Sequence, residues 1–514
     1  MDLTITREPV YVSEVIYDGQ AEQGVEFDYI LPDYYPDIFK ILKCTLKPKI
    51  VSYNISGDKL ICDGIVYITA LYLSENSNNL NCVEHRYTYS KTIDLPKAAE
   101  NVGVIITPKT DYCTCRAVSG RRLDVRGAVS LKIKACCGRF AEIITSAGGY
   151  GVQTKKTPVL YGGRKITSEK QFVVREDIEA SDAKGGVKAV ISCDCVSTVG
   201  DCKVIADKVV LKGEAKLKAV YLTEYEGETR TEIMEADVPL SQIIDVDGIT
   251  EKHTCYAQLN ILSCDLSVKQ SDEGENRVFG CEITVEAFVS ANLEETIYPV
   301  TDMYSTDFES SFNTVQLKTE TNPRYISQSL TLKEKVECTE GEPESVIDCR
   351  CELSNITCKG KSAEELIVSG QAAYQVLARI NDGVPVFLEK VLPFELSMQV
   401  TGLTHESSIE PFLQVTSTDY SITGDNSIEI RAGISMQGCL YQNGSVDVIK
   451  DITVDESAPK AKQNDYSLKL YFAHTSEDVW SIAKHYNTSA DAILSENGIE
   501  EGAAVSGMLL IPIV

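Results

Sequence analysis

The sequence predicts a mainly β protein: three tandem antiparallel modules, each a β-sandwich or barrel-like sheet, followed by a small domain of the order strand, helix, helix, strand. Two observations predict the modules, because strands of alternating apolar and polar residues recur along most of the chain, and recur at a nearly constant spacing. A third observation predicts the small domain, because two short stretches with helical periodicity and capping residues follow residue 464. The alternation alone does not decide between a sandwich and a barrel.

The strand Val209–Tyr221 shows the alternation most clearly. In VVLKGEAKLKAVY, Gly213 and apolar residues fall on one face of an extended strand and charged residues on the other, which is typical of a half-buried strand. The same pattern surrounds six anchor residues: Gly64, Gly127, Gly213, Cys281, Gly370 and Ala432. At Cys281 and Ala432 the nearest glycine lies one residue away, and we predict β-bulges there.

The anchors define a unit of about 150 residues that occurs three times. Gly64 and Gly213 are 149 residues apart, Gly213 and Gly370 are 157 apart, and within a unit the strand occurs twice. This period is too long for a solenoid whose repeats contact only their neighbours, so we interpret the copies as separate domains in tandem. We place the modules at residues 1–150, 161–310 and 312–456, a linker at 457–464 and the small domain at 465–514.

Turn residues separate the predicted strands inside the modules. Two prolines in Tyr29–Leu42 stop a strand, so this segment is predicted to be either a connecting turn or one or two turns of helix. Ser74–Asn79 is predicted to be a loop, and the glycine-rich stretch Gly148–Gly163 a linker. Hairpin turns are predicted at three further places: Asn381–Gly383, Gly424–Asn426 and Asn443–Gly444.

Composition narrows the classes of partner. A chain of 514 residues normally forms several domains, and a formal net charge of −27 argues against binding to nucleic acids or anionic membranes and favours protein partners. The start, MDLTITREPV, lacks a basic segment followed by an apolar run, and we find no apolar stretch long enough to span a membrane. We therefore expect a cytoplasmic protein without membrane insertion, whose eighteen cysteines are reduced thiols.

The sequence carries no catalytic motif that we recognise, so we expect no enzyme and no cofactor. The five histidines are scattered over different modules, and no zinc-protease, phosphate-loop or nucleophile-elbow motif occurs. Cys193, Cys195 and Cys202 have the same spacing as the cysteines at 349, 351 and 358, which raises the hypothesis of a soft-metal site. Because zinc sites generally use pairs separated by two to four residues, we favour buried thiols on duplicated strands and predict no metal.

The C-terminal stretch contains the signals of two capped helices between two strands. An alternating strand, Leu468–Phe472, precedes a capping box at Thr475–Asp478, and a second capping box spans Thr488–Asp491. Asn497–Gly498 is a helix terminator, and Met508–Pro512 is predicted to be the closing strand. About fifty residues are sufficient for an independent domain.

This stretch resembles a LysM domain, on the strength of Trp480–Ser489 (WSIAKHYNTS), Ile493–Leu494, Asn497–Gly498 and the ending GMLLIPI. The usual Gly-Asp-Thr turn before the first helix is replaced by Ser476–Asp478. The resemblance implies a shallow ligand groove between two loops, lined here by Thr475, Ser476, Glu477, Asp478, Asn497, Gly498, Ile499 and Glu500. With Glu501 nearby, this groove is acidic, which favours a basic protein surface over a wall glycan.

Repeated β modules ahead of a terminal LysM domain, together with the segment LPDYYPDIFKIL, resemble the SipL family of spore coat morphogenetic proteins, whose β modules are called SPOCS domains. The resemblance implies a non-enzymatic scaffold of the mother-cell cytoplasm, recruited to the forespore surface and the spore coat. There its LysM domain would dock on the coat-basement ATPase SpoIVA, and its modules would hold other coat proteins. Two alternatives stay open: a cell-wall protein that binds peptidoglycan or N-acetylglucosamine through LysM, and an enzyme with a metal at the repeated cysteines.

Overall fold

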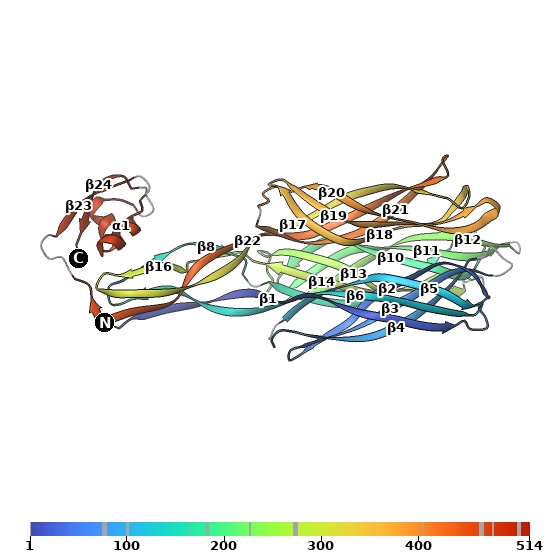
Figure 1. Cartoon of the computed structure of the whole chain (residues 1–514), viewed down its shortest axis with the longest axis horizontal. Coiled ribbons are helices and arrows are strands. Elements are labelled where there is room, and N and C mark those ends of the chain that lie inside the picture. The colour runs from blue at the N-terminus through green and yellow to red at the C-terminus, as the bar shows by residue number, and fades with distance from the viewer. Residues whose placement is uncertain are drawn as a thin grey trace.

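The computed structural model describes residues 2–74, 80–98, 102–163, 165–180, 185–225, 228–270, 276–404, 406–461, 467–474, 477–500 and 505–513. Figure 1 shows an elongated molecule with a wide body, a narrower stalk at the end that holds the N-terminus, and a small domain beside the stalk. The body consists of antiparallel β modules, so the predicted mainly β fold is confirmed. The predicted loop after Ser74 lies outside the described residues.

All three modules share one strand order. The first and the last strand of a module pair with each other, the last also pairs with the strand before it, and the three strands between form a second sheet. The first module comprises β1 (Thr4–Ile30), β2 (Ile38–Ser56), β3 (Lys59–Ser74), β4 (Leu80–Asp94), β5 (Val102–Ser119) and β6 (Arg122–Gly148). The second comprises β9 (Ile166–Glu179), β10 (Gly186–Ile205), β11 (Lys208–Tyr225), β12 (Glu228–Asp245), β13 (Thr254–Gln270) and β14 (Asn276–Asn292). The third comprises β17 (Phe308–Glu337), β18 (Pro343–Ser362), β19 (Glu365–Ile380), η2 (Asn381–Gly383), β20 (Val384–Gln399), β21 (Ser407–Thr423) and β22 (Ser427–Pro459).

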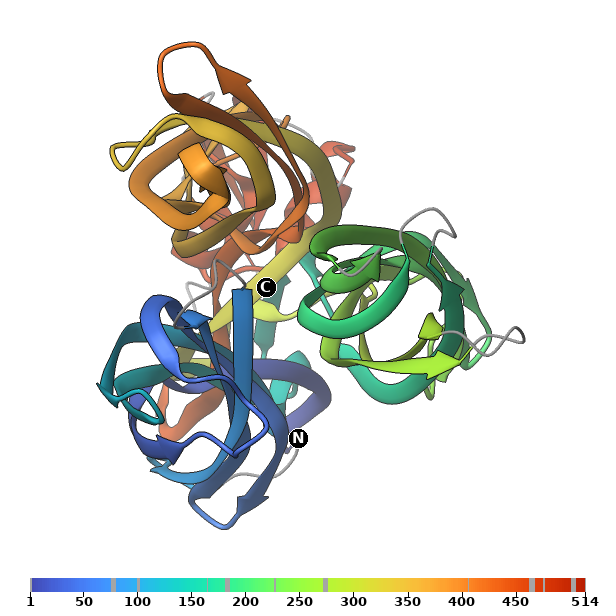
Figure 2. The ribbon, with the colours of Figure 1, turned by 90° about the vertical axis from the view of Figure 1, so that its right-hand side faces the viewer.

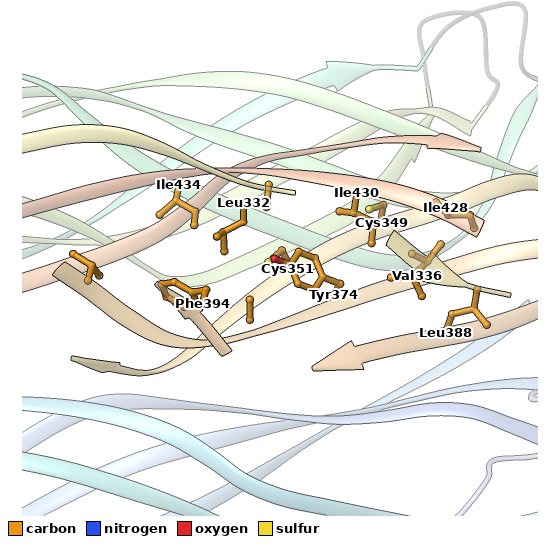
Figure 3. Packing of buried hydrophobic residues seen from close by; sticks show 14 of the residues in the cluster. Leu332, Val336, Cys349, Cys351, Tyr374, Leu388, Phe394, Ile428, Ile430 and Ile434 are labelled. Atoms are coloured by element: carbon orange, nitrogen blue, oxygen red, sulfur yellow. The ribbon is translucent and has the colours of Figure 1, made fainter. Parts of the chain in front are cut away.

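Each pair of sheets encloses buried apolar residues, in one cluster in the second and third modules and in two in the first, so the modules are β-sandwiches. The six anchor residues lie on the middle strands of the six sheets, which are β3, β6, β11, β14, β19 and β22. A middle strand pairs on both sides and turns one face to the core, which explains why the alternation is clearest there. Figure 3 shows this packing in the third module, where Cys351 of β18, Tyr374 of β19 and Phe394 of β20 belong to one core cluster.

The predicted bulges in the middle strands are wrong. The register of β14 is regular at Cys281, and the register shift near Ala432 lies between Val415 and Ser417 of the edge strand β21. An extra residue in a middle strand would disturb two ladders, whereas in an edge strand it disturbs one. Steric crowding explains why an anchor position holds glycine. A Cβ at Gly213 would collide with the carbonyl oxygen of Thr198 on the neighbouring β10.

The stalk is a continuation of the modules. The ribbons β1–β6 and β17–β22 extend beyond their sandwiches, and four short strands prolong the second module in the same way: β7 (Val152–Lys156) with β16 (Val300–Ser305), and β8 (Val159–Tyr161) with β15 (Glu295–Ile297). The stretch predicted to be a linker, Gly148–Gly163, therefore contains two strands. The turn predicted at Asn443–Gly444 is also wrong, since β22 continues through it, paired with β17.

All three modules contribute to the interior of the stalk. One buried cluster unites Ile144 of the first module with Val300 and Met303 of the second and Ile449 of the third. A second cluster joins Val10, Tyr161, Leu317 and their neighbours. Burying Val152 and Tyr161 in these clusters explains why the glycine-rich stretch is ordered as strands.

The three sandwiches also meet along a common axis, which Figure 2 views from the end of the body. Leu71, Val220 and Leu377 lie seven residues after their anchor glycines, and they belong to one apolar cluster together with Leu73, Ile191 and Ile347. Equivalent residues of the three copies thus contact one another. The copies form a ring with an approximate threefold arrangement.

Charged groups join the modules beside this axis. The carboxylate of Asp194 in the second module forms salt bridges with the ammonium group of Lys47 in the first, at 2.6 Å, and with the guanidinium of Arg350 in the third, at 2.5 Å. Arg350 and Lys218 also contact Asp348 at 2.6 and 3.0 Å. Burial raises the pKa of Asp194, but Arg350 and Lys47 outweigh it and hold the pKa well below its ordinary value.

Within Tyr29–Leu42, residues 31–37 form a connecting turn between two strands, so the helix alternative is wrong. β1 ends at Ile30 and β2 begins at Ile38. The Arg121 guanidinium holds the turn by donating to the carbonyls of Leu31 at 3.1 Å and Pro32 at 2.8 Å, and to the Asp37 carboxylate at 2.7 Å. These bonds satisfy the backbone without helical hydrogen bonds.

The C-terminal residues form strand, helix, helix and strand in the predicted order: β23 (Leu468–Ala473), α1 (Val479–Tyr486), α2 (Ala490–Asn497) and β24 (Gly507–Pro512). β23 and β24 pair antiparallel, and their inner face packs on Ile482, Ala483 and Ile493 of the helices. We call residues 467–513 the C-terminal domain.

Candidate docking sites

The helix caps differ slightly from the predicted capping boxes. Asp478 caps α1 by accepting the Ser481 N–H at 2.8 Å, and Ser489 caps α2 by accepting the Ala492 N–H at 3.1 Å. Thr488 is instead fully buried, and its hydroxyl donates to the Pro512 carbonyl at 2.6 Å. The second helix therefore starts one residue later than its capping box suggests.

One side of the predicted groove is engaged with the stalk. Thr475 and Ser476 lie outside the described residues. The Asp478 carboxylate accepts Lys155 of β7 at 2.8 Å, and although burial raises its pKa, Lys155 and the Ser481 N–H bring the pKa to about 2. Glu477 accepts the His474 N–H and the Tyr471 hydroxyl, which lower its pKa.

The other side of the predicted groove serves the domain itself. The Asn497 amide donates to the carbonyls of Ile493 at 2.8 Å and Leu510 at 2.7 Å and accepts the Leu510 N–H, so it ties α2 to β24. Gly498 ends α2 with a φ of 60°, and Ile499 packs against the core. Glu500 is exposed.

The C-terminal domain docks on the stalk tip, a contact that the sequence did not predict. Asp302 of β16 accepts the Trp480 indole N–H at 2.8 Å and the Lys484 ammonium at 2.7 Å. Tyr304 lies edge-on to Trp480 and donates to the Thr488 carbonyl at 2.6 Å. Trp480 therefore reports on the junction with the stalk as well as on the C-terminal domain.

The outer face of the C-terminal sheet is apolar and exposed. Leu470, Phe472 and Met508 are 64, 69 and 70 % exposed, and Leu468 continues the row along β23. Phe472 and Met508 are directly opposite each other in the two strands. We call these four residues the outer apolar face; exposed apolar surface of this kind is typical of interaction sites.

A second exposed apolar group lies at the end of the first module away from the stalk. Ile30, Tyr34 and Phe39 are 71, 80 and 69 % exposed; Tyr34 lies in the turn that Arg121 holds, and the other two lie on the strands beside it. The corresponding connections of the other modules, residues 180–185 and 338–342, contain no aromatic residue. We call these three residues the distal aromatic turn.

A cavity of about 80 Å³ lies where the three modules meet, lined by Lys43, Ser192, Asp348, Arg350 and Phe387 among others. Its charged groups pair with one another or with neighbouring side chains: Lys43 donates to Glu389 at 2.7 Å, and Arg350 contacts Asp348 at 2.6 Å. This cavity belongs to the interface between modules.

The repeated cysteines lie on equivalent edge strands, β10 and β18, and all eighteen cysteines are free thiols. Among the described residues, no group of three or more His, Cys, Asp or Glu side chains is placed to hold a metal ion. Within the same residues, we find no helix with the length and apolar character needed to cross a membrane.

Comparison with known proteins gives a family match. A model of the family described as "SipL, SPOCS domain" matches residues 37–118 and 186–269. These two ranges are structurally equivalent, since they cover β2 to β5 of the first module and β10 to β13 of the second. No curated protein and no solved structure matches the chain. The first two modules are therefore each similar to the SPOCS domain of the SipL family.

Proposed function

We propose that this protein is a non-enzymatic scaffold of spore coat assembly and that its C-terminal domain, acting as a LysM domain, docks on a coat-basement ATPase similar to SpoIVA. The similarity of two modules to SPOCS domains supports a role in sporulation. The observation that carries the docking proposal is the outer apolar face, on which Leu470, Phe472 and Met508 are each more than 60 % exposed. In this proposal the protein resides in the mother-cell cytoplasm and is recruited to the forespore surface.

The contacts of the domain favour the outer apolar face over the predicted groove as the main docking surface. Asp478 is paired with Lys155, and Asn497 is bonded to β24, so these groups are already engaged. Within the part of the chain that the structure describes, Phe472 and Met508 of the outer face are exposed, and a partner that buried them would gain apolar contact area. Glu500, an exposed acidic residue of the predicted groove, favours a partner that also carries basic residues.

The modules provide the rigid part of the scaffold. Shared clusters in the stalk and along the axis join all three, so the modules do not move as separate beads. The C-terminal domain at the stalk tip and the distal aromatic turn are consequently held at opposite ends of one body. We propose that the distal aromatic turn holds a second coat protein.

The test is binding of the full chain to the purified SpoIVA-like ATPase, measured by isothermal titration calorimetry. We expect Phe472→Ser to weaken binding tenfold or more, because the partner would lose a buried aromatic contact. Val391→Ser, at a residue of β20 that is 53 % exposed, is the matched control and should leave binding unchanged.

Two results would contradict the proposal. If Glu500→Lys abolishes binding while Phe472→Ser does not, the docking surface is the groove. If purified peptidoglycan captures the protein and chitin oligomers compete, while the ATPase does not bind, the glycan-binding alternative is correct.

A further inference from the structure

The second module contains a row of facing thiols between its two sheets. β10 and β13 are edge strands of different sheets, and Figure 1 shows them next to each other. The sulfur of Cys193 lies 3.4 Å from that of Cys264, and the sulfur of Cys202 lies 3.5 Å from that of Cys255. Between the two pairs, the Ser197 hydroxyl donates to the Leu259 carbonyl at 2.8 Å, so the strands stay close along the row. We call this row the thiol seam.

The spacing of the pairs makes the thiol seam a built feature. Cys193 and Cys202 are nine residues apart on one strand, and Cys255 and Cys264 are nine apart on the other, so both pairs follow one antiparallel alignment. The third module lacks the second half of the seam. Its β18 keeps three cysteines, but β21 has none, and Thr418 donates to the Cys349 carbonyl there. Packing of a sandwich seam therefore does not require facing thiols.

The thiols are placed to react. All four are partly exposed, unlike the fully buried core thiol of Cys62. In one pair the hydrogen bond between the two sulfurs lowers the pKa of Cys202 and raises that of Cys255. Because the thiolate is the nucleophile in disulfide exchange, Cys202 is the attacking sulfur of its pair.

We propose that the thiol seam is a redox modification site, in which a small-molecule disulfide converts Cys193–Cys264 and Cys202–Cys255 into two disulfides that join the sheets of the second module. In each pair one protein thiolate attacks the small disulfide and releases one small thiolate. The second protein thiolate then attacks the mixed disulfide at the protein sulfur and releases the other. Two protein thiols are oxidised and one small disulfide is reduced to two thiols, which take up the two protons.

The two disulfides would stabilise the second module. In a reducing cytoplasm the seam stays as thiols, and the sheets are held together by packing and by hydrogen bonds such as that of Ser197 with Leu259. After oxidation, covalent bonds close loops of more than fifty residues, which restricts the unfolded chain and stabilises the sandwich.

The experiment treats the folded full chain with oxidised glutathione, blocks remaining thiols with iodoacetamide and maps peptides by mass spectrometry without reduction. We expect peptides that join Cys193 to Cys264 and Cys202 to Cys255, and a rise of the melting temperature by about 5 °C or more. Cys193→Ser should remove the first link and keep the second, and Cys202→Ser the reverse. Cys358→Ser in the third module should leave both links intact.

Three outcomes would overturn the proposal. The first is full alkylation of all four cysteines after oxidant treatment, which would show that the pairs do not close. The second is linkage of Cys264 to Cys195 or Cys281, or crosslinks between chains at the same rate as those within the chain. The third is a stoichiometric metal in the purified protein that protects the four thiols until a chelator removes it.

Discussion

The middle strands of the sandwich modules and the strands of the C-terminal sheet differ in how much apolar surface they leave exposed to solvent. Strands β3, β11 and β19 bury one face inside their own sandwich, and their far ends place Leu71, Val220 and Leu377 in a cluster shared by all modules. In the C-terminal domain, by contrast, Phe472 is 69 % exposed in a strand whose other face is buried. The difference separates middle strands that bury their apolar residues within the framework from a small sheet that leaves one apolar face exposed.

The same substitution in both regions should give very different losses of stability. Phe279 of β14 is fully buried and packs edge-on against Tyr221 at 5.0 Å. We expect Phe279→Ala to lower the free energy of unfolding by about 3–5 kcal/mol, because it leaves a cavity in the core. Phe472→Ala should change it by less than about 0.5 kcal/mol. Hydrogen exchange of peptides from β14 and β23 measures both, and equal losses would refute the contrast.

The charged junction beside the axis tests whether the modules depend on one another. Asp194→Ala leaves Arg350 and Lys47 without their shared carboxylate, and we expect a loss of roughly 3 kcal/mol at neutral pH, since the Asp194 side chain is 28 % exposed. The folded-state pKa of Asp194 is depressed, so its stabilisation is present above the ordinary pKa and is lost as the pH falls through the folded value. Guanidinium unfolding at several pH values measures the loss. Val391→Ala, at an exposed residue of β20, is the control.

The repeat could be predicted from the sequence because its signal is local. Gly64, Gly213 and Gly370 sit on middle strands, where alternation over a dozen residues is imposed by one buried face. The stalk has no such signal. Its core residues Ile144, Val300 and Ile449 come from three distant segments, and no pattern within one segment shows that it packs against the other two.

The predicted groove of the C-terminal domain likewise depends on contacts between distant segments, which the sequence pattern does not reveal. Resemblance to a domain family placed Asp478 and Asn497 in a groove, but the structure engages Asp478 with Lys155 of a strand more than three hundred residues earlier. The partners of Trp480, which are Asp302 and Tyr304, also lie in another module. A contact between domains depends on their relative placement, which no local pattern encodes.

Weakening the contact between the C-terminal domain and the stalk should cost less free energy than the substitutions at Phe279 and Asp194. Asp302→Ala removes the acceptor of both the Trp480 indole N–H and the Lys484 ammonium, and we expect the docked state to lose about 1–2 kcal/mol. The emission of Trp480, the single tryptophan, should shift to longer wavelength as its ring gains water. Asp177→Ala, which breaks an exposed ion pair with Lys269, should leave the emission unchanged. An unchanged emission in Asp302→Ala would contradict the docked arrangement.

The smallest effect is expected at the cap of α1. Asp478→Ala removes the cap of Ser481 and the pair with Lys155, and because the Asp478 side chain is 49 % exposed we expect a loss of only about 0.5–1 kcal/mol. The folded pKa of about 2 lies below the ordinary value of 3.8, so this contribution is present above pH 4 and disappears as the pH falls toward 2. Ser489→Ala, at the cap of α2, removes a neutral hydroxyl and should cost a similar amount at every pH. Hydrogen exchange of α1 and α2 between pH 6 and 2.5 distinguishes the two. A loss in Asp478→Ala that does not depend on pH would mean that its carboxylate caps the helix without the charge that Lys155 recognises.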